Sequence, residues 1–157
     1  MTPPPFQRFL DEQRDPVWRF LVAAVGRDAA DDCFQETFLA AMRAYPKLRD
    51  ASNLRSWALT IASRKAIDHH RSRKRSPVPV GGPPEPREHA APPGEPGEGE
   101  AWTAVRALPT RQRDVLLLRY AGDLTHRDVA AALGCSEEAS RQAAREGLAR
   151  LRGEVER

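Results

Sequence analysis

The residues with the most distinctive chemistry form a basic run from Arg64 to Arg75. Six Lys or Arg stand there against one Asp, which gives the run a net charge of +5. On a helix, Arg64, Asp68, Arg71 and Arg75 lie on one side, in line with Trp57. Cations beside an aromatic ring suit single-stranded or opened nucleic acid, because bases stack on the ring while the cations follow the phosphates. The run therefore favours a polyanion partner; a solvated helix end, with Trp57 in the core, is the alternative.

The residues that could catalyse a reaction or bind a metal do not form a known motif. Cys33 and Cys135 lie far apart inside apolar patterns, and the sequence contains no CxxC, HExxH or EF-hand loop. The neighbouring His69 and His70 point to different sides of a helix. We therefore expect no metal, no cofactor and no catalytic residue, with a metal-dependent nuclease as the weaker alternative.

The sequence predicts no membrane segment. No stretch approaches ~18 consecutive apolar residues, the length that a spanning helix needs. The N-terminal sequence "MTPPPFQRF" lacks the basic region and long apolar run of a secretion signal. A cytoplasmic protein with reduced cysteines is the expectation.

Proline and glycine divide the chain into two parts. Eight of the 14 Pro and five of the 10 Gly fall between Ser76 and Glu100, where one Arg stands against five Glu. Such a segment cannot form a regular element and buries little apolar surface. The sequence therefore predicts an all-α protein of two small helical domains, 1–75 and 101–157, joined by a disordered linker, 76–100.

Apolar residues recur at helical spacing through the first part. The pattern predicts a helix over 7–25, with a kink or break near Asp15 because Pro16 follows. A second helix is expected from Asp28 to the residue before Pro46, and a third from Asn53 to Arg75. The second should bury Cys33, Phe34, Phe38, Ala41, Met42 and Tyr45, and the third Leu54, Trp57, Ala58, Ile61 and Ala62.

The second part reads as a short helix followed by a helical hairpin. A helix near Trp102 should end at Pro109, and Thr110 is expected to cap the next helix, which Gly122 closes. Thr125 and Asp128 resemble a capping box, Gly134 permits the tight reversal that follows, and Ser136 caps the last helix. These proportions fit a helix-turn-helix, although helical hairpins with a Gly turn are common, so DNA binding is one of two interpretations at this point.

Taken together, these segments resemble a known family. "DAADDCFQETFLAAMRAYPKLRDASNLRSWALTIASRKAIDHHRSRKR" resembles region two of the bacterial sigma factors, and "ALPTRQRDVLLLRYAGDLTHRDVAAALG" resembles their region four. Both regions in this order, separated only by a variable linker, are similar to the extracytoplasmic-function group of sigma-70 relatives. The resemblance implies a non-enzymatic protein that binds core RNA polymerase and promoter DNA and promotes DNA opening. It also implies an anti-sigma partner and no small-molecule substrate.

The resemblance also implies site residues. The polymerase contact would fall on the outer face of the second helix, away from Phe38 and Met42: Asp32, Gln35, Glu36 and Leu39. The third helix would bind the melted minus-ten element, and "SRK" there replaces the "ARN" of many relatives, which puts Lys65 at a position that bears on base choice. The minus-ten residues would be Ser56, Trp57, Thr60, Arg64, Lys65, Asp68, His69, Arg71 and Arg73.

The helix after the Gly134 turn would enter the major groove of the minus-thirty-five element. Arg141 keeps the cationic position and Gln142 could bond adenine, but Glu137 and Glu138 would repel phosphates, so we expect an altered or reduced grip. A sigma-like regulator that binds DNA or an anti-sigma factor without starting transcription is therefore the alternative function. The minus-thirty-five residues would be Arg127, Ser136, Ser140, Arg141, Gln142 and Arg145.

Overall fold

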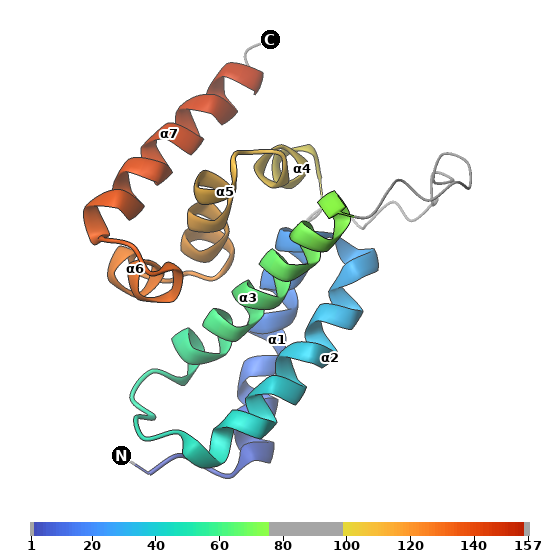
Figure 1. Cartoon of the computed structure of the whole chain (residues 1–157), viewed down its shortest axis with the longest axis vertical. Helices are drawn as coiled ribbons and strands as arrows, with labels where there is room; N and C mark the ends of the chain where they lie inside the picture. The colour runs from blue at the N-terminus through green and yellow to red at the C-terminus, as the bar shows by residue number, and fades with distance from the viewer. Residues whose placement is uncertain (1, 76–98, 156–157) are drawn as a thin grey trace.

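The computed structural model describes residues 2–75 and 99–155, which contain helices and no strand (Figure 1). The all-α prediction is confirmed. The predicted linker lies almost wholly in 76–98, outside the described residues. The helices are α1 (Phe6–Val25), α2 (Arg27–Ala44), the 3-10 turn η1 (Tyr45–Lys47), α3 (Leu54–Arg75), α4 (Glu100–Arg106), α5 (Thr110–Leu116), the π-helical η2 (Leu117–Ala121), α6 (His126–Leu133) and α7 (Glu137–Val155).

Helix α1 runs without a break through Pro16, so the expected interruption near Asp15 is wrong. A proline inside a helix removes one backbone hydrogen bond. Packing compensates for that loss here, because Val17 and every residue from Phe20 to Val25 are buried. The helix ends at Gly26, whose φ of 83° lies in the left-handed region that favours glycine.

Helices α1, α2 and α3 pack side by side around an aromatic cluster (Figure 1). Phe9 lies at its centre, with ring centroids 5.3 Å from Tyr45 and 6.2 Å from Phe38. The expected stripe of α2 is correct except at Met42, which is 50% exposed. The buried face of α3 is wider than expected, because Leu59 is fully buried as well.

The second unit comprises α4 to α7, and its middle helix α5 changes geometry. The N-cap of α5 is Pro109, with no side-chain hydrogen bond, so the expected cap at Thr110 is wrong. In η2 the amide of Gly122 donates to the Leu117 carbonyl at 3.0 Å, an i→i+5 bond of the π type. All four residues from Val115 to Leu118 are buried. Burial on every side of a helix requires packing partners on more than one side.

Those partners come from both units. Helix α5 packs against α7, while η2 and α4 pack against α1, and α6 packs against α3. Between the two units, a Cβ on Gly122 would lie 3.3 Å from Leu59 Cδ1. The sequence predicted two separate cores, but the buried residues form one continuous cluster across both units. Among the described helices, none combines the length and the hydrophobicity needed to cross a bilayer.

Candidate nucleic-acid interface

The outer face of α2 carries acids beside an apolar patch. Asp32, Gln35 and Glu36 are exposed, and Leu39 is 48% exposed. Met42 lies three residues beyond Leu39 and is equally open, so it belongs to this face and not to the core. The structure thus brings all four predicted residues together and adds a fifth. The apolar spacing of α2 could not reveal this, because Met42 fits either face.

The acids of this face affect the thiol behind them. Burial raises the pKa of Cys33 to about 11, and the negative charges of Glu36 and Asp32 add to the rise. A thiol with such a pKa stays protonated and unreactive at neutral pH. Cys33 is therefore a core residue of α2.

The basic end of α3 forms an exposed row. Arg64, Asp68 and Arg71, which the spacing places on one side of the helix, are exposed, and so is Arg73. Among the described residues, no carboxylate lies within ion-pair distance of Arg64, Arg71 or Arg73. The half-buried members of the predicted set are Ser56, Trp57, Thr60, Lys65 and His69.

Trp57 points into the core and does not extend the basic row. Its ring centroid lies 5.5 Å from that of Phe9 and 6.1 Å from that of Tyr45. The contact with Phe9 is edge-to-face and the one with Tyr45 is tilted, and aromatic pairs at such distances stabilise a core beyond the area they bury. The core alternative for Trp57 fits this geometry, and any nucleotide could reach only the exposed part of the ring.

Two histidines line the basic end of α3. The Nε2 atom of His70 lies 2.7 Å from the Ala24 carbonyl, while the Nε2 atom of His69 is buried with no partner among the described residues. Burial lowers the pKa of both imidazoles below the usual value. Both are neutral at neutral pH, so the positive charge here comes from Lys and Arg. No described cluster of His, Cys, Asp and Glu could hold a metal ion.

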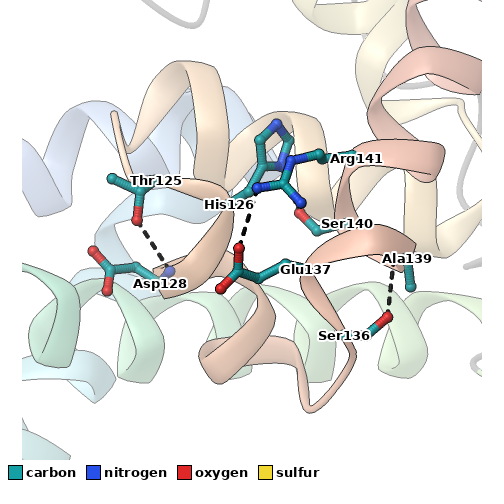
Figure 2. A network of polar contacts seen from close by, with 8 residues as sticks. All are labelled: Thr125, His126, Asp128, Ser136, Glu137, Ala139, Ser140 and Arg141. Atoms are coloured by element: carbon teal, nitrogen blue, oxygen red, sulfur yellow. Dashed lines mark hydrogen bonds and ion pairs between the residues drawn. The ribbon is translucent and has the colours of Figure 1, made fainter.

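The predicted reading helix, α7, pairs its own charges. Arg141 Nη2 lies 3.1 Å from Glu137 Oε2, and Arg145 Nη2 lies 3.3 Å from Glu138 Oε1. Arg145 also donates to Gln142 Oε1 at 2.7 Å. Arg141 and Arg145, the two cations of the predicted reading surface on this helix, are therefore already engaged by acids in its first turn. Figure 2 draws the ion pair between Glu137 and Arg141 as a dashed line.

Ser140 does not fit the role that the resemblance implied for it. It is fully buried, and its hydroxyl lies 2.8 Å from His126 Nδ1 on α6. The residue faces α6 because it shares a helical row with Ala144 and Leu148. It joins the two helices and cannot meet a base in this structure. The apolar residues that share this row with Ser140 were the signal in the sequence that Ser140 is buried.

Most of the cap hydrogen bonds that the sequence predicts for α6 and α7 are present in the structure. Ser136 is exposed, and its Oγ accepts from the Ala139 amide at 3.0 Å (Figure 2). Thr125 Oγ1 accepts from the Asp128 amide at 3.1 Å, which is half of the expected capping box. The Asp128 carboxylate accepts from Asn53 Nδ2 at 3.3 Å, across to the other unit. Arg127 is exposed beside this contact.

Other polar residues at the junction of the units escaped sequence reasoning. Arg106 Nη1 donates to the Ala23 carbonyl at 3.0 Å, at the C-terminal end of α1. Arg113 and Asp114 form a buried pair at 3.1 Å. Burial raises the pKa of Asp114, and the positive charges of Arg113 and Arg71 oppose that rise. No local motif marks Arg106, because its partner Ala23 lies far away in the sequence. Arg113 and Asp114 are neighbours in the sequence, but their burial depends on tertiary packing.

Comparison with known proteins assigns both units. Residues 9–76 match the family Sigma-70 region 2, and residues 98–151 match Sigma-70, region 4. The ECF RNA polymerase sigma factor SigC of Mycobacterium tuberculosis is 35% identical over 135 residues, covering 82% of this chain and 71% of the relative. The ECF RNA polymerase sigma factor SigD of the same species is 32% identical over 158 residues, covering 93% and 74%.

Two solved structures share the fold. The sigma factor RpoE of Bartonella quintana, in complex with the anti-sigma factor NepR, superposes with a TM-score of 0.75 at 20% identity and covers 96% of both chains. CnrH in complex with the cytosolic domain of CnrY has a TM-score of 0.70 at 18% identity, covering 96% of this chain and 87% of the other. At such identities the likeness extends to the fold alone.

Both sigma regions are present in order, and the relatives match over most of their own length. The implied function is therefore that of a transcription initiation factor without enzymatic activity. The chain belongs to the ECF group of the sigma-70 family, the sigma factors that direct RNA polymerase to promoters.

Proposed function

We propose that this sigma factor divides its task among three helices: α2 binds core polymerase, α3 holds the opened minus-ten strand, and α7 reads the minus-thirty-five element. The observation that carries this proposal is the row of exposed arginines on α3 without described ion-pair partners, next to the exposed acidic face of α2 in the same unit. One rigid unit can then hold polymerase and DNA together.

For polymerase, the proposed contact is the α2 face of Asp32, Gln35, Glu36, Leu39 and Met42. Acids on this face complement a basic partner helix and set its orientation. The two exposed apolar side chains supply area that association removes from water. A face with both features can dock a helix, whereas a merely solvated helix face has no need of Leu39 and Met42.

For the minus-ten element, Arg64, Arg71 and Arg73 would neutralise phosphates of the opened strand. Ser56 and Thr60 lie on the N-terminal half of α3, where half-exposed hydroxyls can bond bases. A surface that binds the single strand better than the duplex shifts the equilibrium toward melting. The sigma factor needs no chemical energy for this, because polymerase catalyses the synthesis.

For the minus-thirty-five element, the proposed contacts remain Arg127, Ser136, Arg141, Gln142 and Arg145, and Ser140 is withdrawn because it is buried. Binding of DNA would exchange the ion pairs of Arg141 and Arg145 with Glu137 and Glu138 for phosphate contacts. Exposed ion pairs are worth at most about 1 kcal/mol each. The exchange is therefore possible but weakens the grip.

We also infer the cellular location of the protein and one further protein partner. Work with RNA polymerase places the protein in the cytoplasm, where both cysteines would stay free thiols, as they are here. An anti-sigma factor is a further partner, because two proteins of the same fold were solved in complex with other chains, NepR and the cytosolic domain of CnrY.

Run-off transcription with reconstituted holoenzyme on a promoter library tests the function. A sigma factor gives discrete starts that disappear when it is left out. The alternative, a sigma-like regulator without initiation activity, would bind DNA or polymerase yet give no specific start. That result would overturn the proposal, and the selected promoters serve as probes in the experiments below.

A further inference from the structure

The side-chain amide of Gln142, a proposed reading residue of α7, is held at both ends. Its Nε2 atom donates to Glu146 Oε1 at 2.9 Å, one helical turn further along. Its Oε1 atom accepts from Arg145 Nη2 at 2.7 Å. All three residues are exposed, so both bonds lie on the outer side of the helix. The amide of Gln142 therefore has a preferred orientation before any DNA is bound.

Charge decides which end of this amide points which way. The Glu146 carboxylate has only acceptors, so it takes the NH₂ end of Gln142. The Arg145 guanidinium has only donors, so it takes the oxygen. A reversed amide would place its oxygen against the carboxylate and its NH₂ group against the guanidinium, and both bonds would be lost. Two neighbours of opposite charge thus select one orientation.

Glu146 is itself anchored on the core of the region 4 unit. Its Oε2 atom accepts from Nε2 of Gln112, a buried residue of α5, at 3.4 Å. Helices α5 and α7 pack closely at this point (Figure 1), and Gly147 permits the approach. A Cβ on Gly147 would lie 3.4 Å from Gln112 Cβ and 2.7 Å from Leu116 Cδ1. The position of the carboxylate is therefore set by α5 as well as by α7.

The held amide keeps one donor and one acceptor free. A primary amide has two N–H groups and an oxygen with two lone pairs, and the two bonds to Glu146 and Arg145 use one of each. In the major groove adenine offers the acceptor N7 beside the donor N6, and a Gln amide can bond both at once. Guanine offers two acceptors, N7 and O6, so the amide oxygen would face an oxygen. A free amide can turn to suit another base, whereas an oriented one favours adenine.

We propose that Glu146 is a positioning residue for base recognition: it orients the Gln142 amide so that α7 selects adenine at one position of the minus-thirty-five element. This inference rests on the proposed function of α7 as the reading helix. Glu146 touches no base itself and sets which base its neighbour accepts. This role gives a use to an acid on a helix that binds phosphates, where negative charge otherwise weakens binding.

Phosphate binding by Arg145 is compatible with this role. Arg145 Nη2 carries two N–H groups, and its second bond goes to Glu138 Oε1 at 3.3 Å. A phosphate oxygen can replace the Glu138 carboxylate there while the bond to Gln142 stays. The amide then keeps both of its orienting neighbours when DNA is bound.

Base discrimination by the reconstituted holoenzyme tests this role. Duplex fragments of a selected promoter carry each of the four base pairs in turn at every position of the minus-thirty-five element, and competition binding gives the affinity ratios. At one position the wild type should prefer adenine by about tenfold, which is within the range of a bidentate contact. Gln142→Ala should remove that preference and so identify the position.

Glu146→Ala should lower the preference at the same position from about tenfold to about threefold, because Arg145 alone then orients the amide. In a Gln142→Ala background the same substitution should change nothing at that position, because the residue through which Glu146 acts is absent. Glu146 is exposed, so the circular dichroism spectrum and the unfolding transition should not change.

Glu137→Ala is the matched control, because it removes another acid of α7 that bonds Arg141 and not Gln142. It should raise the affinity for all fragments by a similar factor and leave the adenine preference at the Gln142 position intact. An equal loss of preference in this control would overturn the inference, since charge alone would then explain the effect. So would a Glu146→Ala protein with the full preference, or a base other than adenine at the Gln142 position.

The failure of this inference and that of the proposed function give different results. If Gln142→Ala flattens one position and Glu146→Ala does not, only the role of Glu146 is overturned. If Gln142→Ala changes the preference at no position, the proposed reading role of Gln142 fails and the inference fails with it. Run-off transcription from the same promoters decides separately whether the protein initiates transcription.

Discussion

The two helices proposed to bind DNA, α3 and α7, present the arginines of their proposed DNA contacts in opposite ways. Within the described residues, Arg64, Arg71 and Arg73 of α3 have no carboxylate at ion-pair distance. On α7, Arg141 and Arg145 each pair with an acid of the first turn. A cation without a partner can neutralise a phosphate directly, whereas a paired one must first leave its acid. Region 2 should therefore supply most of the affinity and salt dependence, and region 4 a weaker contact.

The largest effect is expected from Arg71→Ala with Arg73→Ala. Each phosphate contact to a single strand contributes about −0.7 to the slope of log affinity against log salt, so the slope should flatten by about 1.4. Promoter opening should fall by roughly a hundredfold, because each lost charge-assisted contact costs about 1.5 kcal/mol. Salt titrations of holoenzyme on a selected promoter, with a fluorescent reporter of melting, measure both quantities.

Arg14→Ala with Arg19→Ala is the charge-matched control, because both arginines are exposed on α1 and neither is a proposed DNA contact. It should leave the slope and the opening nearly unchanged. An equal loss in the control would mean that net charge, and not the α3 row, drives opening. That result would remove the contrast between the two helices.

The second effect concerns the α2 face. Gln35→Ala with Glu36→Ala should weaken binding to core polymerase by about tenfold, because a charged contact and a hydrogen bond at the partner helix are lost. Both residues are exposed, so the unfolding transition should not move. Fluorescence titration against core enzyme and circular dichroism measure the two. Asp31→Ala, also exposed on α2, is the control, and equal affinities for it and the double variant would refute this docking face.

The third prediction tests whether the ion pairs on α7 weaken its binding to DNA relative to α3. Glu137→Gln with Glu138→Gln releases Arg141 and Arg145, so affinity for minus-thirty-five duplex should rise by about threefold to tenfold and its salt slope should steepen. Glu12→Gln breaks a similar exposed pair with Arg8 on α1 and serves as the control. If the double variant binds duplex no better than this control, the ion pairs of α7 do not limit its grip.

Local chemistry in the sequence predicted the helices and most of their caps. Thr125, Gly134 and Ser136 act as expected, since a cap depends on residues within one turn. The break at Pro16 was wrong because tertiary packing holds α1 together, and the exposure of Met42 was missed because α2 leaves that side uncovered. Periodicity tells which residues share a face and not what covers that face.

The candidate site shows the same limit. The basic row of α3 could be predicted because it depends on spacing along one helix. The inward turn of Trp57 and the burial of Ser140 depend on Phe9 and His126, which belong to other helices. The contact of Asn53 with Asp128 joins residues of different units. Such contacts come from tertiary packing, which no local pattern encodes.

The smallest effect separates a structural residue of the helix-turn-helix from a reading one. Ser140→Ala leaves Nδ1 of the half-buried His126 without its partner, which should lower the free energy of unfolding by about 1 kcal/mol. Because Ser140 is fully buried, the affinity for minus-thirty-five duplex should hold as long as the domain is folded. Gln142→Ala is the counterpart on the exposed face: it should weaken duplex binding and leave stability unchanged. Urea unfolding and duplex titration of both variants test this division, and a Ser140→Ala protein of full stability with weakened DNA binding would return Ser140 to the reading surface.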